Sequence, residues 1–501
     1  MQNYIGTVIS TEDTPNIYEF KFIITSNVKA GQYISVNTNE GEYIGKIKNI
    51  IKISPYFQNP DAVKEIEKTG SSISEVFPSD NWEYLIGDVE VIGLFNNGNI
   101  SKAYFPVTPG AKVYIAKNYI LEKIFGFDLE NGLNLGKIEH HNLDVKINMS
   151  KLLKKHLAVL AMSGAGKSYF TSVLIEELLD KKENEQPAII LIDPHGEYSG
   201  FNDDLNYRKK VNLIKGKDFK ISVPTLNAEF LIDLMPDPSS VQKRELRRIF
   251  SIVKEKYRNT AYNLDKIIEE LNNDEEIKSD TKNILLNFLE DLNDTGIFAE
   301  FDNPSLEKIT RQGHLTIIDI SDITELREKR IIVAILAKKL FLARRANIIP
   351  PFLFIVEEAH NFAPQQVKKE NAISKNIIEK IAREGRKFYA CLCLISQRPV
   401  HLSTTAISQC NTHVLLRITN PYDIQHIQES CEGITGESVK ILPSLKVGEA
   451  IVVGEAVNFP IQLKVREMKS KFRKSDVSLE EACKKFACEK LKFEEDAKAF
   501  F

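Results

Sequence analysis

Long apolar segments are missing from this 501-residue chain: nowhere do about 18 apolar residues follow one another, as a transmembrane helix requires. The first ten residues, MQNYIGTVIS, lack the basic-then-apolar pattern of a secretory signal. An excess of charge is also missing, because 66 lysines and arginines face 69 aspartates and glutamates, for a net charge of −3. We therefore expect a cytoplasmic protein with no membrane segment and no global positive field, although a basic inner channel is compatible with this balance.

Cysteine is scarce, with six residues, at positions 391, 393, 410, 431, 483 and 488. No two of them form a C-x-x-C pair, and no histidine stands at metal-ligand spacing from them, which argues against the common zinc motifs. We expect reduced, buried thiols. Hydrophobic residues at 43% and charged residues at 27% are ordinary for a globular protein, and the length predicts roughly two to four domains.

The most informative stretch is His156–Ser168, HLAVLAMSGAGKS. Leu157–Leu160 predicts a buried strand and Tyr169–Leu179 an amphipathic helix, with a glycine-rich turn between them. A strand, a turn ending in Lys-Ser and a helix together are typical of a phosphate-binding loop. Ala161 stands where the first glycine of this motif is usual, and a tight turn survives there if its φ stays negative.

We expect this loop to bind ATP and Mg²⁺. Backbone N–H groups of the small residues converge on phosphate oxygens, and the helix directs its positive N-terminus at the same place. Lys167 is expected to reach the β- and γ-phosphates, and Ser168 to bind Mg²⁺. The predicted nucleotide-binding residues are Ser163, Gly164, Ala165, Gly166, Lys167 and Ser168.

The chain predicts four parts. Residues 1–116 contain short strands separated by Gly, Pro and Asn, which favours a small β-barrel, and Ile17–Ile24 alternates with Tyr18, Phe20, Phe22 and Ile24 on one face. Residues 117–155 are expected to be a connector. Residues 156–466 alternate strands and helices, the pattern of an α/β fold with a parallel sheet, interrupted by a helical insertion at about 228–312. Residues 467–501 are expected to form a charged helical tail that braces a neighbouring subunit.

A second informative stretch is PFLFIVEEAH, in which five apolar residues predict a central strand that ends in two carboxylates. A P-loop ATPase needs one acid there for Mg²⁺ and often a second to orient or deprotonate the attacking water. We assign the first role to Glu357, although aspartate is more usual, and the second to Glu358. Asp193 and Glu197 follow another buried strand and are further candidates near Mg²⁺, a water molecule or a neighbouring subunit.

Three polar residues complete the predicted catalytic set. Gln397 follows the strand Tyr389–Ile395 and is the candidate for sensing the γ-phosphate or positioning water. Arg383 and Arg386 lie at a helix end that would face the next subunit of a ring, where arginine stabilises the transferring phosphoryl group. Capping of the helix C-terminus by these cations is an equally good interpretation.

The motifs AMSGAGKS, LIDPHGEY, FLFIVEEAH, IAREGRKF and SQRP, in this order, resemble the HerA family of archaeal and bacterial DNA translocases, within the FtsK/HerA group of ring ATPases. The resemblance covers nearly the whole chain. It implies a RecA-like P-loop core and a homo-hexamer that threads double-stranded DNA using ATP and Mg²⁺. It also implies a NurA-type nuclease that docks on the N-terminal barrel, with a helicase role in end resection and double-strand break repair.

Alternative functions stay open. One is an antiphage-defence or conjugation-type coupling ATPase, and another is a ring scaffold for a nuclease that nucleotide only stabilises. Contacts to DNA are expected from the loop Gln365–Lys375, with its lysines Lys368, Lys369 and Lys375. The basic cluster within 243–248 is a weaker candidate, because a solvated helix face explains it as well.

Overall fold

The computed structural model describes residues 4–54, 57, 60–68, 83–258, 260–366 and 373–471, with 480, 481, 483, 484 and 486. By compactness the chain divides into two units. Unit 1 comprises Met1–Leu152, Glu432–Ile441 and Glu449–Arg466, and unit 2 comprises Leu153–Cys431, Leu442–Gly448 and Glu467–Phe501. The domain boundaries expected from the sequence stay a prediction. Within the described ranges, no helix combines the length and the apolar character needed to cross a bilayer.

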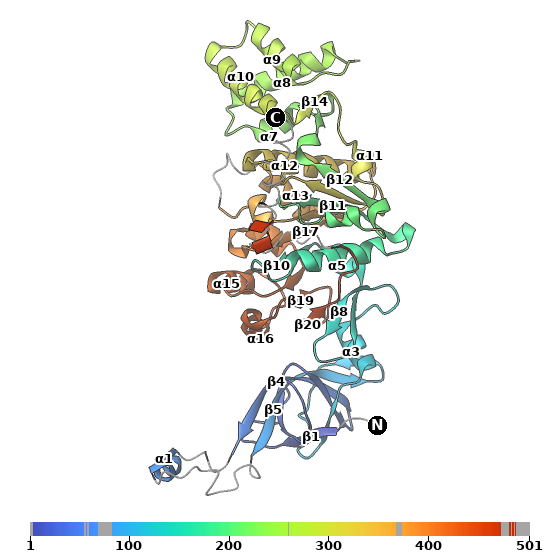
Figure 1. Ribbon diagram of the computed structural model, residues 1–501, viewed down its shortest axis with the longest axis vertical. Coiled ribbons are helices and arrows are strands. Elements are labelled where there is room, and N and C mark those ends of the chain that lie inside the picture. The colour runs from blue at the N-terminus through green and yellow to red at the C-terminus, as the bar shows by residue number, and fades with distance from the viewer. Residues whose placement is uncertain are drawn as a thin grey trace, which may run out of the picture. The chain divides into compact units, whose positions relative to one another are not determined.

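A closed barrel of six strands forms much of unit 1 (Figure 1). Its strands are ordered β2-β1-β7-β3-β4-β5, and β5 pairs with β2 to close the ring. The strands are β1 (Tyr4–Ile9), β2 (Glu19–Ile24), β3 (Tyr33–Thr38), β4 (Gly41–Ile53), β5 (Tyr84–Asn96) and β7 (Lys112–Ile115), and β6 (Asn99–Ser101) extends the sheet beside β5.

Alternation in β2 fills the barrel with Phe20 and Phe22, which are almost completely buried. Tyr18 was expected on the same face, and this expectation is wrong because Tyr18 precedes the strand and is 73% exposed. The Asn16 side chain accepts hydrogen bonds from the Tyr18 and Glu19 N–H groups, at 2.8 and 3.0 Å. These bonds form a turn that includes Tyr18, and β2 begins after it, at Glu19.

The segment expected as a connector carries regular structure of its own. It forms α3 (Asn118–Phe125), β8 (Leu133–Ile138), β9 (Asp144–Ile147) and α4 (Met149–Leu153). β8 pairs antiparallel with β9 and with β20 (Ile461–Val465), which in turn pairs with β19 (Glu449–Gly454). Chain segments more than 300 residues apart therefore form one antiparallel ribbon, a pairing that local sequence patterns do not reveal.

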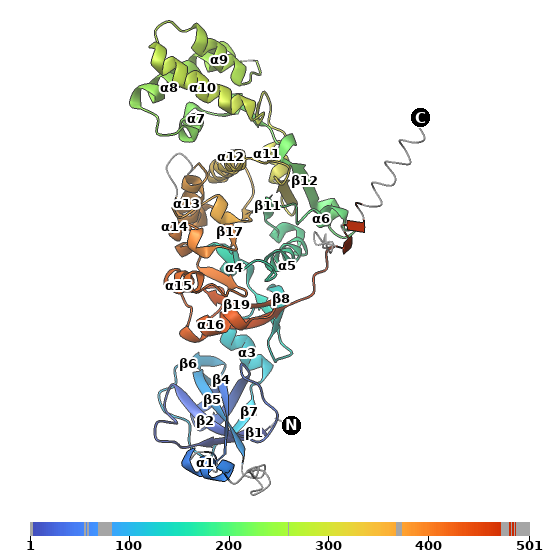
Figure 2. The same cartoon turned by 60° about the vertical axis from the view of Figure 1, so that its left-hand side comes forward.

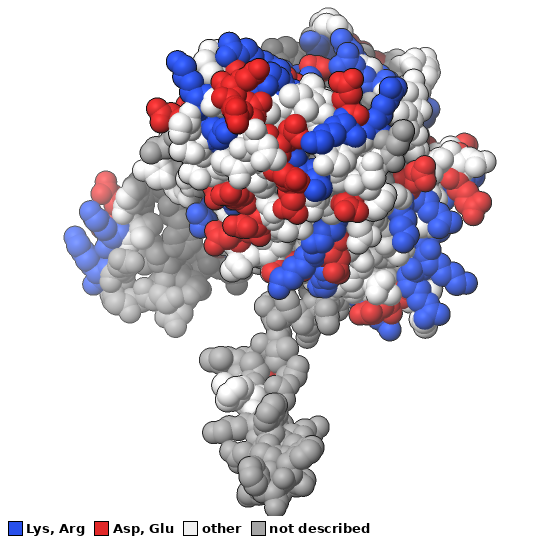
Figure 3. All heavy atoms as spheres, turned by 90° about the horizontal axis from the view of Figure 1, so that it is seen from above, with Lys and Arg blue, Asp and Glu red and all other residues white. Residues whose placement is uncertain are grey.

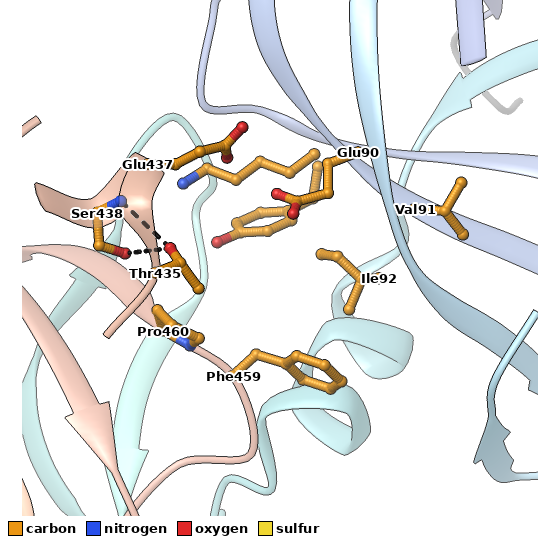
Figure 4. Close-up of a pocket in the computed structure, with 10 residues that line it drawn as sticks. Glu90, Val91, Ile92, Thr435, Glu437, Ser438, Phe459 and Pro460 are labelled. Carbon is orange, nitrogen blue, oxygen red and sulfur yellow. Dashed lines mark hydrogen bonds between the residues drawn. The ribbon is translucent and has the colours of Figure 1, made fainter. Parts of the chain in front are cut away.

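Unit 1 also contains a cavity of about 140 Å³ that both charged and apolar residues line (Figure 4). Glu90 of β5 and Glu437 of α16 (Gly436–Ile441) both line it. Glu437 forms an ion pair of 3.0 Å with Lys48 of β4, and burial together with the nearby Glu437 raises the pKa of Glu90. Paired charges of both signs therefore surround this cavity.

A parallel sheet forms the core of unit 2, as the alternating pattern predicts. Its order is β12-β15-β11-β16-β17-β10-β18, and each neighbouring pair runs parallel. Because the strands are parallel, their carboxyl ends share one edge of the sheet, where open α/β folds bind ligands. The strands are β10 (Leu157–Leu160), β11 (Ala188–Asp193), β12 (Val211–Lys215), β15 (Leu315–Asp319), β16 (Phe352–Val356), β17 (Ala390–Ser396) and β18 (Thr412–Leu415).

The predicted helical insertion is present, and Figures 1 and 2 show its helices as one group. It consists of α7 (Ala228–Leu234), α8 (Ser240–Lys256), α9 (Leu264–Asn273) and α10 (Ser279–Asp294). The short parallel pair of β13 (Ile221–Ser222) and β14 (Phe298–Ala299) joins its two ends. Arg244, Arg247 and Arg248 of α8 form ion pairs with Glu245, Glu229 and Asp274. These acidic partners favour the solvated-face interpretation of the basic cluster. Figure 3, a view of the molecule from above, shows basic and acidic side chains intermingled.

The described beginning of the C-terminal segment lies on α5 (Lys167–Leu179), the helix after the phosphate loop. The buried Glu176 carboxylate accepts hydrogen bonds from Lys469 N, Ser470 N and Ser470 Oγ at 2.7–2.9 Å. Most of the expected tail helix, from 472 onward, lies outside the described residues. The same holds for Lys368 and Lys369.

The described cysteines are all free. Cys393, Cys410 and Cys431 are buried, and Cys391 is half-buried, as expected for structural thiols. Burial raises the pKa of Cys391 and of Cys431 to about 12, which keeps both thiols protonated and unreactive. Cys483 is exposed, contrary to the general expectation of buried thiols.

Candidate nucleotide-binding and catalytic site

The glycine-rich turn lies at the carboxyl end of β10 and leads directly into α5, as predicted. Gly164 and Gly166 have φ values of +73° and +102°, a conformation that side chains beyond glycine adopt with strain. A Cβ added to Gly164 would meet no atom within 4 Å, so this part of the turn faces open space. Ala161 does not adopt a positive φ, and its N–H donates to Ser396 O at 3.2 Å. The turn therefore forms without the usual first glycine.

The structure brings Lys167 and Glu358 together, although 191 residues separate them. Lys167 Nζ lies 3.1 Å from Glu358 Oε1, and the two side chains are 11% and 4% exposed. Burial pulls the pKa of Lys167 down, but the charges of Glu357 and Glu358 outweigh it and raise this pKa. The second oxygen, Glu358 Oε2, is buried and accepts no hydrogen bond from the described residues, with His360 Nδ1 3.3 Å away. Glu358 itself has a left-handed backbone with φ +49°.

Glu357 points into a different environment from its neighbour. It is 3% exposed, and the buried phenol of Tyr198 donates a short hydrogen bond to Glu357 Oε1. Burial raises the pKa of Glu357 to about 7, although Lys167 and the Tyr198 hydrogen bond act in the opposite direction. An acid whose pKa lies near neutrality requires a compensating cation to stay charged.

We expect the substitution Glu357→Gln to stabilise the folded protein at pH 8, because it removes a buried charge. A pKa raised from 4.5 to about 7 corresponds to roughly 3 kcal/mol, an upper limit. The folded state binds this proton more tightly, so the wild-type protein loses stability as the pH rises from about 4.5 to 7, and the gain of the variant fades toward pH 5. Denaturant unfolding at both pH values, without nucleotide and metal, measures the difference. An equal effect at pH 5 and pH 8 would contradict the expectation.

Ser168, the predicted Mg²⁺ ligand, donates a short hydrogen bond to Glu197 Oε2. Glu197 follows β11, and the intervening turn is held by Asp193. The Asp193 carboxylate accepts hydrogen bonds from the N–H groups of His195, Gly196, Glu197 and Tyr198 at 2.8–3.2 Å. Of these two acids, Glu197 therefore reaches the phosphate loop, whereas Asp193, the last residue of β11, orders the backbone of the turn.

Gln397 follows β17 directly, one strand away from the acids of β16, as predicted. It lines a cavity of about 530 Å³ together with Arg398, His401 and Tyr422. The preceding residue, Ser396, is buried, and its Oγ lies 3.1 Å from His360 Nδ1. The His360 side chain thus lies between the end of β17, the strand before the predicted sensor Gln397, and Glu358.

Arg383 and Arg386 lie elsewhere. They belong to α13 (Lys375–Glu384) and to the 3₁₀ turn after it, which precede β17 at the amino end of the strand. Both side chains are exposed, and Arg383 Nη1 lies 3.8 Å from Glu379 Oε2 of the same helix. Neither guanidinium belongs to the group around Lys167 in its own chain, so a catalytic role for either requires a second copy of the chain.

Two residues of the site, the buried Tyr198 and the half-buried His360, were not predicted as site residues from the sequence. Tyr198 binds Glu357, and His360 lies beside Glu358. Both belong to motifs that carry the HerA resemblance, LIDPHGEY and FLFIVEEAH, but nothing in the local pattern shows which way their side chains point.

The residues present fit a nucleotide with Mg²⁺. The open turn at Gly164 and the N-terminus of α5 suit phosphate groups, and the buried Lys167 supplies the positive charge. Ser168 and Glu357 are oxygen donors of the kind that Mg²⁺ prefers, and Glu197 is a third close by. Bound Mg²⁺ would neutralise phosphate charge, and deprotonation of the Glu357 carboxyl group would favour the binding of Mg²⁺.

Comparisons with known proteins identify relatives over most of the chain. The family model described as "Helicase HerA, central domain" matches residues 133–340. A probable helicase of Methanocaldococcus jannaschii is 30% identical over 94% of this chain and 92% of its own length. The DNA double-strand break repair helicase HerA of Pyrococcus furiosus is 26% identical over 94% of this chain and 93% of its own length.

Among solved structures, VirB4 of Thermoanaerobacter pseudethanolicus covers 68% of this chain and 98% of its own, with a TM-score of 0.53 and 16% identity. At this identity the likeness concerns the fold alone, which is that of a P-loop ATPase. The family match spans the phosphate loop, and the relatives extend over the barrel as well as the acidic strand end. This chain therefore belongs to the HerA family of P-loop ATPases.

Proposed function

We propose that this protein is an ATP-driven translocase and helicase for double-stranded DNA, which works as a hexamer. The observation that carries the proposal is the contact between Lys167 and Glu358, because it joins the phosphate loop and the acidic strand end in one site. In this arrangement Lys167 binds the β- and γ-phosphates, Ser168 and Glu357 hold Mg²⁺, and Glu358 orients and deprotonates water. Gln397, at the neighbouring strand end, senses the γ-phosphate.

The names of the relatives support a role in DNA end processing. Relatives in Pyrococcus furiosus and Sulfurisphaera tokodaii are both named as DNA double-strand break repair helicases, and each alignment covers at least 93% of both chains. We propose the same role here, with a NurA-type nuclease as partner and the barrel of unit 1 as its docking site. Hydrolysis at the subunit interfaces would then drive the ring along the phosphate backbone, independently of sequence.

The decisive experiment follows ATP hydrolysis and movement together. We expect duplex DNA to stimulate the ATPase of the wild-type protein, and translocation to displace a third strand from the duplex. Lys167→Ala is expected to reduce both activities by at least about 100-fold, because the cation at the transferring phosphate is lost. Arg311→Ala, an exposed residue before β15, is the control and should behave as wild type. Hydrolysis that DNA neither stimulates nor requires would contradict the motor function.

The mass of the assembly tests the hexamer separately. Native mass measurement with an ATP analogue and duplex DNA is expected to give six copies of the 56.9 kDa chain. A stable monomer under these conditions would leave Arg383 and Arg386 without a neighbour's nucleotide and would contradict the ring.

A further inference from the structure

The cavity beside Gln397 lies at the catalytic edge of the sheet. Arg398 and His401 line it from the loop after β17, and Tyr422 and Asp423 line it from the start of α15 (Pro421–Ser430), after β18. β17 and β18 pair with β10 from its two sides. Because all three strands are parallel, the cavity opens at the same edge as the phosphate loop, within unit 2.

We propose that this cavity, named the Arg398 pocket after its lining residues Arg398, His401 and Tyr422, binds the sugar–phosphate backbone of duplex DNA. The contact is passed to Glu358 through Ser396 and His360. This inference rests on the proposed function and adds to it the DNA-contacting residues and a route from DNA to the catalytic carboxylate.

The chemistry of the pocket suits a phosphate backbone. Arg398 and His401 are exposed, and the Arg398 guanidinium forms no ion pair within the described part of the chain. Tyr422 is 76% exposed and adds an aromatic face with a hydroxyl donor. Arginine, histidine and tyrosine side chains are typical donors to phosphate oxygens, and such contacts carry no sequence preference, which a translocating motor requires.

The single acid of the pocket has a structural partner. Asp423 is 9% exposed, and its Oδ1 accepts a hydrogen bond from Val400 N at 3.1 Å. This bond holds the loop after β17 against α15. Gln365 N donates to His401 O at 2.8 Å, which fixes the far end of the loop. Two hydrogen bonds therefore fix the loop that carries Arg398.

A short chain of contacts leads from this loop to Glu358. Arg398 N donates to Ser396 Oγ at 3.0 Å, and the same oxygen lies 3.1 Å from His360 Nδ1. His360 Nδ1 also lies 3.3 Å from Glu358 Oε2. A single ring nitrogen is thus within reach of two oxygens. A protonated Nδ1 can donate to either oxygen, whereas an unprotonated Nδ1 can only accept from Ser396 Oγ. A shift of Ser396 when DNA binds would move His360 relative to the Glu358 carboxylate, which makes His360 a positioning residue.

Binding of DNA tests the pocket. We expect Arg398→Ala to weaken binding of the full-length protein to a mixed-sequence duplex about tenfold. The slope of log affinity against log salt concentration should also become shallower, by about 0.9 for each phosphate that the variant no longer neutralises. Arg311→Ala removes one exposed guanidinium before β15, at the opposite edge of the sheet, and is the matched control. Equal affinities of the two variants would overturn the proposal. A raised KM for ATP with unchanged DNA affinity would overturn it too, because the pocket would then belong to the nucleotide.

The ratio of DNA-stimulated to basal ATPase tests the route. His360→Ala is expected to bind duplex with wild-type affinity but to lose most of the stimulation, and His360→Asn, whose amide can contact both oxygens, is expected to restore part of it. Thermal unfolding checks that each variant is folded. Full stimulation in His360→Ala would overturn the route. If the wild-type protein itself neither binds DNA nor responds to it, the proposed function fails, whereas a responsive wild type with an unaffected Arg398→Ala variant refutes this inference alone.

Discussion

Glu358→Gln is expected to lower the rate of ATP hydrolysis by about 10²–10⁴-fold, the usual contribution of a general base, while ATP binding is retained. Glutamine keeps the size of the side chain but cannot accept a proton. The variant also loses the charge partner of Lys167, 3.1 Å away, so the lysine becomes freer to bind phosphate. Affinity for ATP should therefore be unchanged or higher. Single-turnover hydrolysis and equilibrium nucleotide binding, measured on the same preparation, separate the two effects.

Glu307→Gln, an exposed glutamate of α11 (Leu306–Ile309), serves as the matched control and should leave hydrolysis unchanged. The Glu358→Gln variant also separates motor from scaffold. If a partner nuclease is activated fully by Glu358→Gln protein that binds ATP without turnover, nucleotide only stabilises the ring and the motor function is wrong. Activation that needs turnover favours the motor.

Arg383 and Arg386 carry the second large prediction, because an arginine supplied by a neighbouring subunit is worth about 10³–10⁵ in rate. Both side chains are exposed at the amino end of β17, away from Lys167 of their own chain. We expect alanine at one of the two positions to reduce hydrolysis at least about 1,000-fold, with normal ATP binding. The other substitution should have little effect, as expected of a helix-capping cation.

Mixing inactive variants tests whether this arginine acts on a neighbour. When Glu358→Gln chains are reassembled with chains that lack the active arginine, some interfaces combine an intact Glu358 with an intact arginine. At equal amounts about a quarter of the interfaces should be complete by random assembly, so a comparable fraction of activity should return. A mixture as inactive as its components would show that the arginine acts within its own chain.

Local sequence patterns were sufficient to predict most of the strands, loops and helices that form the site. The apolar run Leu157–Leu160 and the turn SGAGKS predict the strand, the glycine-rich loop and the helix that the structure contains. The five apolar residues before Glu357 likewise predict β16. These patterns work because a buried parallel strand needs a continuous apolar run, and because positive φ at Gly164 and Gly166 demands glycine.

Other features were beyond a local interpretation. β8 and β9 lie in a segment expected as a connector, and β8 pairs with β20, which is more than 300 residues away in the sequence. Tyr18 has the right spacing for the barrel core, yet the Asn16 turn keeps it outside β2. Hydrogen bonds decide both features: those between β8 and β20 pair the strands, and those to Asn16 set the start of β2. The alternation of apolar residues does not reveal either set of bonds.

The sequence by itself determined the phosphate loop, the order of the α/β elements, the paired acids and the HerA resemblance, because each depends on neighbouring residues or a short motif. Only the tertiary structure decided that Lys167 meets Glu358, that Tyr198 binds Glu357 and that His360 lies between Glu358 and Ser396. These contacts join the ends of strands that lie near one another in the sheet but are distant in the chain: β11 and β16 are adjacent, as are β16 and β17, whereas β17 lies between β16 and β10. Which side chains meet at the carboxyl edge depends on the order of the strands in the sheet, and the sequence of a single segment does not encode that order.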